Sequence, residues 1–200
     1  YTDTKVQWND CPHAELGLER YMARLTERFL TAIEPDESKG EEALVPILNR
    51  YQAKGSTGRV DFKTTKPCQA TEASHINQVA LDTKQWEQSA AFHLELAAKQ
   101  GHLRCYARNE RLEFNVPYDY EGQGHSYQPD FLVQIEPRRT LILEIKGEED
   151  DQDREKYEAA RRWVRAVNRW GALGAWRFEV CKAPNELQAL ITRVRAENWS

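Results

Sequence analysis

Tyr127-Gln128-Pro129-Asp130-Phe131-Leu132-Val133 and Leu141-Ile142-Leu143-Glu144-Ile145-Lys146-Gly147 are the stretches that decide the fold of this chain. Both are apolar and rich in residues that favour β-strands. Side chains along a strand alternate between the two faces of a sheet, so Glu144 and Lys146 fall on the same face of the second strand. We therefore expect two adjacent strands that carry charged groups into an apolar sheet.

The link between these strands places a proline at its second position, within residues 136–139, as tight turns commonly do. A tight turn would bring the carboxylates of Asp130 and Glu144 and the ammonium of Lys146 into one small cluster. A buried sheet does not normally accept three charges on one face, because an unpaired buried charge is costly. The cluster is therefore a candidate functional site.

Length and composition indicate one ordinary domain with an appendage. The chain has 200 residues, of which 40% are hydrophobic and 30% charged. None of the apolar runs is long enough to span a membrane. The net charge of -4 excludes a chain that is basic throughout, so a polyanionic partner would have to meet a local patch.

Four cysteines lie far apart in the sequence, at Cys11, Cys68, Cys105 and Cys181. Their spacing favours neither a zinc ribbon nor a disulfide framework. Reduced thiols are typical of cytosolic proteins, and we expect a cytoplasmic protein. Because the sequence begins at Tyr1 rather than Met, we also expect it to be a piece of a longer chain.

The first part of the chain is the least informative. Helical spacing of apolar residues predicts a helix over 14–32, and a second helix is predicted over 41–52. Residues 59–64 alternate like a short strand. We interpret residues 1–70 as a helical N-terminal extension that links to upstream sequence, and residues 71–200 as the main domain.

A better-defined helix is predicted over 82–99, with a broad apolar face on which Glu87 is the only charge. Glu87 has two interpretations. It is an edge residue that reaches solvent or pairs with a base, or it is a carboxylate aimed at a buried site. Glu95 is an alternative acid on the same helix, but the helical wheel places it at the polar margin, which favours Glu87.

The remaining elements predict an α/β fold. Expected strands cover residues 103–107, 112–118 and 175–181 besides the two quoted stretches, a hairpin loop covers 120–124, and further helices cover 153–170 and 185–197. If the short strand at 103–107 is set aside, the order is α-β-β-β-α-β-α. This order matches a mixed sheet with helices on both faces and a parallel crossover through the helix at 153–170.

The helix predicted at 153–170 has two different faces. Its polar face carries a stripe of arginines, namely Arg161, Arg162, Arg165 and Arg169. The stripe is either a solvated surface or a surface that tracks phosphates and binds nucleic acid in a salt-dependent way. Lys156 falls on the apolar side near the start of the helix, where it is either a lysine that reaches solvent or a contact to phosphate or the candidate site.

The charge cluster suits a hard divalent cation. Mg²⁺ prefers one or two carboxylates, retained waters and substrate phosphate oxygens. Asp130 and Glu144 would supply the carboxylates and Ile145 a backbone carbonyl oxygen. Lys146 would orient or deprotonate the attacking water, or offset charge on the phosphate, and Glu87 would hold a second metal ion or position the water. The predicted reaction is phosphodiester hydrolysis.

These residues resemble the motif of the PD-(D/E)XK nucleases, in which Pro129-Asp130 is followed after thirteen residues by Glu144-Ile145-Lys146. Residues 70–182 are further similar to the C-terminal nuclease region of type III-like restriction subunits. The stretches that carry this likeness are Trp86–Ala91, Tyr127–Val133, Leu141–Gly147 and Arg162–Asn168. The sequence contains no P-loop or other helicase motif.

The resemblance implies a restriction-endonuclease-like αβββαβ core in which residues 71–200 form the nuclease domain. It implies Asp130 and Glu144 as ligands of Mg²⁺ or Mn²⁺, Lys146 as the catalytic lysine and Glu87 as the acid of the first helix. It also implies double-stranded DNA as substrate, a superfamily-2 helicase or translocase in the same longer chain, and a prokaryotic cytoplasm. A recognition subunit and a homodimer are further expectations.

Two functions from different classes remain. The first is a Mg²⁺-dependent DNA endonuclease from a restriction or anti-phage defence protein. The second is a non-cleaving module of nuclease fold that binds DNA or a partner for an attached helicase or translocase. The presence of Asp130, Glu144 and Lys146 together favours the enzyme. A nickase, an exonuclease and RNA as substrate stay open.

Overall fold

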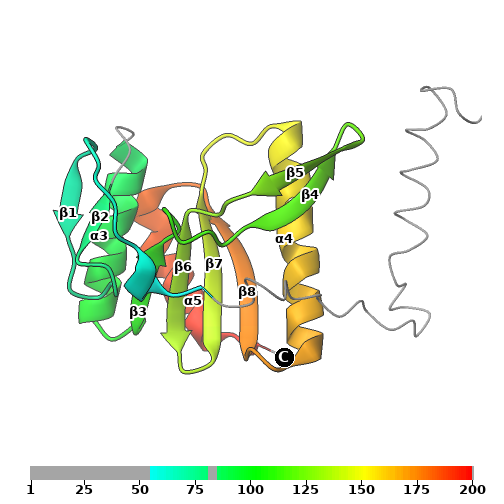
Figure 1. The fold of residues 1–200 in the computed structure, drawn as a ribbon. Coiled ribbons are helices and arrows are strands. Elements are labelled where there is room, and N and C mark those ends of the chain that lie inside the picture. The colour runs from blue at the N-terminus through cyan, green and yellow to red at the C-terminus, as the bar shows by residue number, and fades with distance from the viewer. Residues whose placement is uncertain (1–54, 81–84, 200) are drawn as a thin grey trace, which may run out of the picture.

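The computed structural model describes residues 55–80 and 85–199. Its centre is a four-stranded sheet in the order β3-β6-β7-β8, formed by Cys105–Arg108, Phe131–Glu136, Arg139–Ile145 and Ala175–Cys181 (Figure 1). β6 pairs antiparallel with β3 and with β7, whereas β7 and β8 run parallel. The predicted α/β class and the parallel crossover are confirmed. The helices predicted at 14–32 and 41–52 lie outside the described residues.

The turn between β6 and β7 has the proline that was expected. It leaves Arg138 in the left-handed region, with a φ of 64°. The connection from α4 to β8 packs against this turn and is hydrogen-bonded to it, because Ala175 N–H donates to the Arg138 carbonyl at 2.8 Å. Gly174 has a φ of 83°, and a Cβ there would collide with the Arg138 carbonyl oxygen. Glycine is therefore required at this close approach.

One face of the sheet is covered by α3 (Gln85–Lys99) and α5 (Leu187–Ala196), as Figure 1 shows. Alternate residues of the two central strands point to this face, in keeping with the period of two. They are Phe131, Val133, Leu141, Leu143 and Ile145. They form one buried cluster with the apolar side of α3, including Ala90, Ala91 and Leu94.

The opposite face is covered by α4 (Asp151–Trp170). Ile142 of β7 and Phe178 of β8 are buried there against Tyr157 and Ala160. Glu144 and Lys146 have the same parity as Ile142, so the predicted sharing of one face places both on the α4 side. α4 ends at Gly171, which takes the left-handed conformation common at helix C-termini, with a φ of 71°.

Two small sheets and two short helical turns complete the described fold. β4 (Val116–Tyr120) and β5 (Gln123–Tyr127) form a hairpin beside α4 (Figure 1). β1 (Cys68–Ala70) pairs with β2 (Gln78–Ala80). The 3₁₀ turns are η3 (Thr57–Arg59) and η4 (Pro184–Glu186). No helix in the described ranges is long and apolar enough to cross a membrane.

The structure corrects two strand predictions. Residues 59–64 do not form a strand, since η3 ends at Arg59 and residues 60–65 are irregular. The strand expected at 112–118 begins only at Val116 and belongs to the β4–β5 hairpin rather than to the central sheet. The place beside β6 is taken by β3, the short strand that had been set aside, where Tyr106 and Ala107 are buried.

Candidate active site

The carboxylates of Asp130 and Glu144 meet where β6 begins and β7 ends. Asp130 immediately precedes β6, and its N–H donates to Oε2 of Glu144 at 3.3 Å. The N–H of Ile145 donates to Oδ2 of Asp130 at 2.8 Å. Tyr127, the last residue of β5, donates its hydroxyl to the same Glu144 oxygen at 2.7 Å. The predicted convergence of the two acids is confirmed.

The two acids repel each other in the metal-free protein. Burial and the negative charge of Asp130 raise the pKa of Glu144 to about 8, although the hydrogen bonds from Tyr127 and the Asp130 backbone act in the opposite direction. Burial and the adjacent Glu144 also raise the pKa of the Tyr127 hydroxyl. Near neutral pH Glu144 therefore carries a proton that a bound cation would displace.

This pair of acids fits a magnesium ion better than a metal that needs many protein ligands. Mg²⁺ keeps several waters and commonly takes one or two carboxylates. Within residues 55–80 and 85–199 there is no group of three or more histidine, cysteine, aspartate or glutamate side chains that could enclose a metal ion. The Ile145 carbonyl as a further ligand stays a prediction.

Glu87 lies in α3, but its side chain is outside what the structure describes. Its neighbour Trp86 packs against Gly147, where an added Cβ would lie 2.5 Å from Cη2 of the indole. The beginning of α3 is therefore adjacent to the chain that leaves β7, close in sequence to Glu144 and Lys146. The role predicted for Glu87 stays a prediction.

The placement of Glu95 at a polar margin was wrong. Glu95 is buried, and its carboxylate accepts hydrogen bonds from the N–H groups of Glu72 and Ala73 and, at 3.0 Å, from the Tyr106 hydroxyl. The chain at residues 72–73 covers this side of α3, which a helical wheel does not represent. Glu95 serves to hold that segment against α3.

Lys146 binds a residue that sequence reasoning missed. Its Nζ lies 2.8 Å from Oδ2 of Asp153, and Nζ of Lys156 lies 2.9 Å from Oδ1 of the same carboxylate. Asp153 is only 1% exposed. Although burial alone would raise its pKa, the hydrogen bonds from Lys146 and Lys156 lower it to about 2. The same hydrogen bond raises the pKa of Lys146.

Asp153 went unnoticed because it follows the acidic residues 148–151, and acids at the start of a helix are commonly solvated. Asp150 is such an acid: it is the exposed N-cap of α4, and its side chain accepts from Asp153 N–H at 2.7 Å. Asp153 accepts from Asp150 N–H in return, which completes a capping box. The sequence did carry a signal, namely the Asp-x-x-Asp spacing of Asp150 and Asp153. This spacing indicates a capping box, in which the second acid turns back toward the start of the helix.

The predicted nucleic-acid contacts divide into two groups. Lys156 turns toward Asp153 and the candidate site. The arginine stripe lies exposed along α4, and it comprises Arg161, Arg162, Arg165 and Arg169. Arg161 pairs with Glu158 at 2.6 Å and lies over the Phe178 ring. The exposed position agrees with both interpretations of the stripe, and its role in binding stays a prediction.

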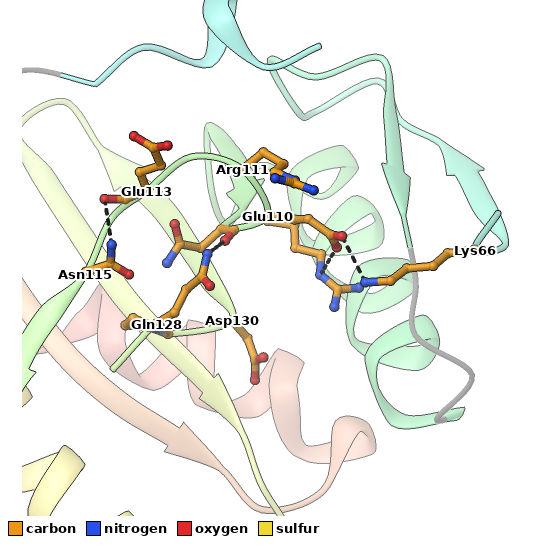
Figure 2. A pocket seen from close by; sticks show the side chains of 10 residues that line it. Lys66, Glu110, Arg111, Glu113, Asn115, Gln128 and Asp130 are labelled. Carbon is orange, nitrogen blue, oxygen red and sulfur yellow. Dashed lines mark hydrogen bonds and ion pairs between the residues drawn. The ribbon is translucent and has the colours of Figure 1, made fainter. Parts of the chain in front are cut away.

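A polar cavity of about 450 Å³ opens beside Asp130 (Figure 2). Its walls come from the end of β3 and the following loop, from the residues before β6 and from one residue near β1. The lining residues are Lys66, Arg108, Asn109, Glu110, Arg111, Glu113, Asn115, Gln128, Pro129 and Asp130. Sequence reasoning did not anticipate this cavity, because its walls come from segments that are separated along the chain.

Comparison of the chain with protein-family models, with curated proteins and with solved structures finds no match.

Proposed function

We propose that the protein is a Mg²⁺-dependent endonuclease that hydrolyses DNA phosphodiester bonds, with a restriction-endonuclease-like core of the PD-(D/E)XK type. The observation that carries this proposal is the adjacent pair Asp130 and Glu144, with Lys146 directly after the strand that holds Glu144. With the separate β4–β5 hairpin set aside, the order α3, β3, β6, β7, α4, β8 supports it, because it follows the αβββαβ pattern. A restriction or anti-phage defence protein is the context we propose.

Each residue of the site has a separate role in this proposal. Asp130 and Glu144 hold the metal ion, and Glu144 gives up its proton when it does so. When bound, Mg²⁺ would polarise the phosphorus centre and lower the pKa of a bound water. Lys146 contacts the phosphate or the attacking water. Because its pKa is raised, Lys146 acts as a cation that orients or neutralises rather than as a base.

Asp153 and Lys156 position Lys146. Asp153 fixes the Lys146 ammonium, but a buried carboxylate cannot lose its only counter-charge without a large cost. Lys156 removes this difficulty, since it neutralises the other oxygen of Asp153. Lys146 can then turn from Asp153 toward a substrate phosphate while the carboxylate stays paired.

The alternative function is a non-cleaving module of nuclease fold attached to a helicase or translocase. One observation favours it: the described side chains include no third acid or histidine beside Asp130 and Glu144 that would complete a metal group. We rank it second because an open magnesium site needs only one or two carboxylates.

The endonuclease proposal includes double-stranded DNA as the substrate and a cytoplasmic location. It also includes three partners: a translocase region of the same chain, a recognition subunit and a second copy in a homodimer.

A cleavage assay distinguishes the two functions. Supercoiled plasmid DNA is incubated with the protein in Mg²⁺, in Mn²⁺ and in EDTA, alongside the variants Asp130→Asn and Lys146→Ala. We expect cleavage with either metal ion, none in EDTA, and a loss of at least about 100-fold in each variant. Asp130→Asn should keep the melting temperature of the parent protein or exceed it, whereas Lys146→Ala should lower it, because the buried Asp153 loses one of its two partners. Equal cleavage in EDTA, or by Asp130→Asn, would contradict the proposed mechanism.

A further inference from the structure

The loop after β3 forms one wall of the cavity beside Asp130 and is held in a strained conformation. Asn109 pins the loop, since its Nδ2 donates to the Phe114 carbonyl at 2.7 Å and its Oδ1 accepts from Phe114 N–H at 3.1 Å. Between these anchors Arg111 and Glu113 have φ values of 58° and 60°. Residues other than glycine seldom adopt this region, and such strain is often associated with a binding role.

The cations that line the cavity differ in how far they are neutralised. Glu110 pairs with the ammonium of Lys66 at 2.9 Å and with the guanidinium of Arg108 at 3.6 Å. Figure 2 shows Glu110 and Lys66 side by side in the cavity wall. Arg108 also donates to the Ala80 carbonyl, which fixes it in the wall. By contrast, no ion pair joins Arg111 to another residue in the described part of the chain. Arg111 is exposed at the rim, on the loop that Asn109 holds rigid.

Arg111 therefore presents a charged fork of hydrogen-bond donors beside the proposed scissile phosphate, from a loop whose backbone Asn109 holds. A guanidinium suits phosphate oxygens through its planar fork of donors, and a loop that is already held loses little conformational freedom on binding. The polar groups around it, from Asn115 and Gln128, suit a hydrated sugar–phosphate rather than an apolar ligand. The repeat of phosphates along a nucleic-acid strand supplies a second anion next to the one that is cut.

We propose that the cavity beside Asp130 is a subsite for a phosphodiester group that flanks the scissile bond, and that Arg111 is the residue that binds it. The inference rests on the proposed function for the identity of the ligand as a DNA strand. It goes beyond that function by assigning a substrate contact outside the metal site and outside the arginine stripe of α4. The strained loop serves to hold this contact in place before the DNA arrives.

Binding measured without catalysis tests the subsite. Fluorescence anisotropy with a short labelled DNA duplex, and with one of its strands alone, is recorded in EDTA from about 50 to about 200 mM salt. The proteins are the parent chain, Arg111→Gly, Arg111→Lys and the control Arg104→Ala. Arg104 is also exposed but lies before β3, at the opposite end of that strand from Arg111. For a duplex, log K falls as log salt rises. Removal of one phosphate-binding charge makes this dependence shallower, because it reduces the magnitude of the slope by about 0.9.

We expect Arg111→Gly to show this shallower salt dependence and to bind DNA about 3- to 10-fold more weakly at low salt. Its Tm should be equal to that of the parent or higher, because glycine relieves the strained φ at this position. Arg111→Lys should retain the parent slope and Arg104→Ala should match the parent. An unchanged slope in Arg111→Gly would overturn the subsite even if the parent chain cleaves DNA. A lower slope in Arg111→Gly, with a parent that does not cleave, would retain the subsite and reject the hydrolysis. Failure of the parent to bind either DNA would overturn both.

Discussion

Lys146 and Lys156 share the two oxygens of one buried carboxylate, that of Asp153, at 2.8 Å and 2.9 Å. The arrangement ties the chain beyond β7 to the first turn of α4. Lys146 is also anchored through its backbone, since its N–H donates to the Cys181 carbonyl of β8 at 3.1 Å. The lysine proposed for catalysis is thus held by two separate elements.

Asp153→Asn tests the positioning role of Asp153. An amide keeps the shape and can still accept from Asp150 N–H, but it removes the charge that holds Lys146. We expect kcat for plasmid cleavage to fall by about 100-fold with little change in KM, since Lys146 acts on the reacting phosphate. The free energy of unfolding should fall by about 2 kcal/mol because charge-assisted hydrogen bonds are removed. Steady-state kinetics and urea unfolding measure both effects.

Asp150→Ala is the matched control for Asp153→Asn. It removes the N-cap side chain of α4 and should cost about 1 kcal/mol of stability. Because Asp150 makes no ion pair with Lys146 in the described structure, kcat per folded molecule should stay unchanged. If both variants lost activity in proportion to their stability, Asp153 would have a purely structural role.

The raised pKa of Glu144 predicts how stability depends on pH in EDTA. An acid whose pKa rises on folding, here from 4.5 to about 8, favours the folded state less as pH climbs between these values. Asp153, with its pKa lowered to about 2, stabilises the fold above its unfolded pKa and loses that effect only in strong acid. Between about pH 5 and about pH 8 the Glu144 effect should therefore dominate this pair.

Glu144→Gln should remove this decline. We expect the parent protein to lose on the order of 2 kcal/mol more than the variant over that pH interval, since one pKa unit corresponds to about 1.4 kcal/mol. Urea unfolding of both proteins in EDTA at the two ends of the interval gives the comparison. Parallel pH profiles would show that Glu144 ionises normally and that the two carboxylates do not repel each other.

A bound divalent cation should offset the repulsion between Asp130 and Glu144 and so stabilise the folded protein. At a Mg²⁺ concentration about 100 times the dissociation constant, the parent protein should gain about 2.7 kcal/mol of stability. Asp130→Asn and Glu144→Gln should gain much less, because each lacks one ligand. Thermal unfolding with and without Mg²⁺ measures the shift. An equal gain in all the proteins would place the ion elsewhere.

The arginine stripe of α4 can be tested separately from the cavity. Arg165 and Arg169 are exposed and make no ion pair with other described residues, so their charges are available to DNA. The double variant Arg165→Ala with Arg169→Ala should lower the salt slope of duplex binding by about 1.8 if both contact phosphates. Arg154→Ala is the control, because Arg154 lies on the same helix but is paired with Asp151 at 2.8 Å. A slope equal to that of the parent would identify the stripe as a solvated surface.

The central hairpin was predictable because its information is local. The two strands and the proline in their turn sufficed to predict that Asp130 and Glu144 meet, whereas the Lys146 side chain pairs with Asp153 of α4. The choice between β3 and the strand at 112–118 was not predictable in this way, since both alternate and only distant pairing decides which one joins β6. Glu95 and Asp153 were misjudged or missed for a related reason: each acid is buried by segments or lysines that a single-helix pattern does not include.

The approach of Gly174 and Ala175 to the Arg138 carbonyl has a practical consequence for engineering the protein. The turn at residues 137–138 is exposed and resembles a tolerant place for an inserted tag or a new chain terminus, yet its backbone is braced by the connection to β8. The other hairpin turn, at Glu121 and Gly122, is exposed, and a Cβ at Gly122 would meet nothing within 4 Å. Reporter dyes and fusion partners belong at residues 121–122, where they leave the four-stranded sheet intact.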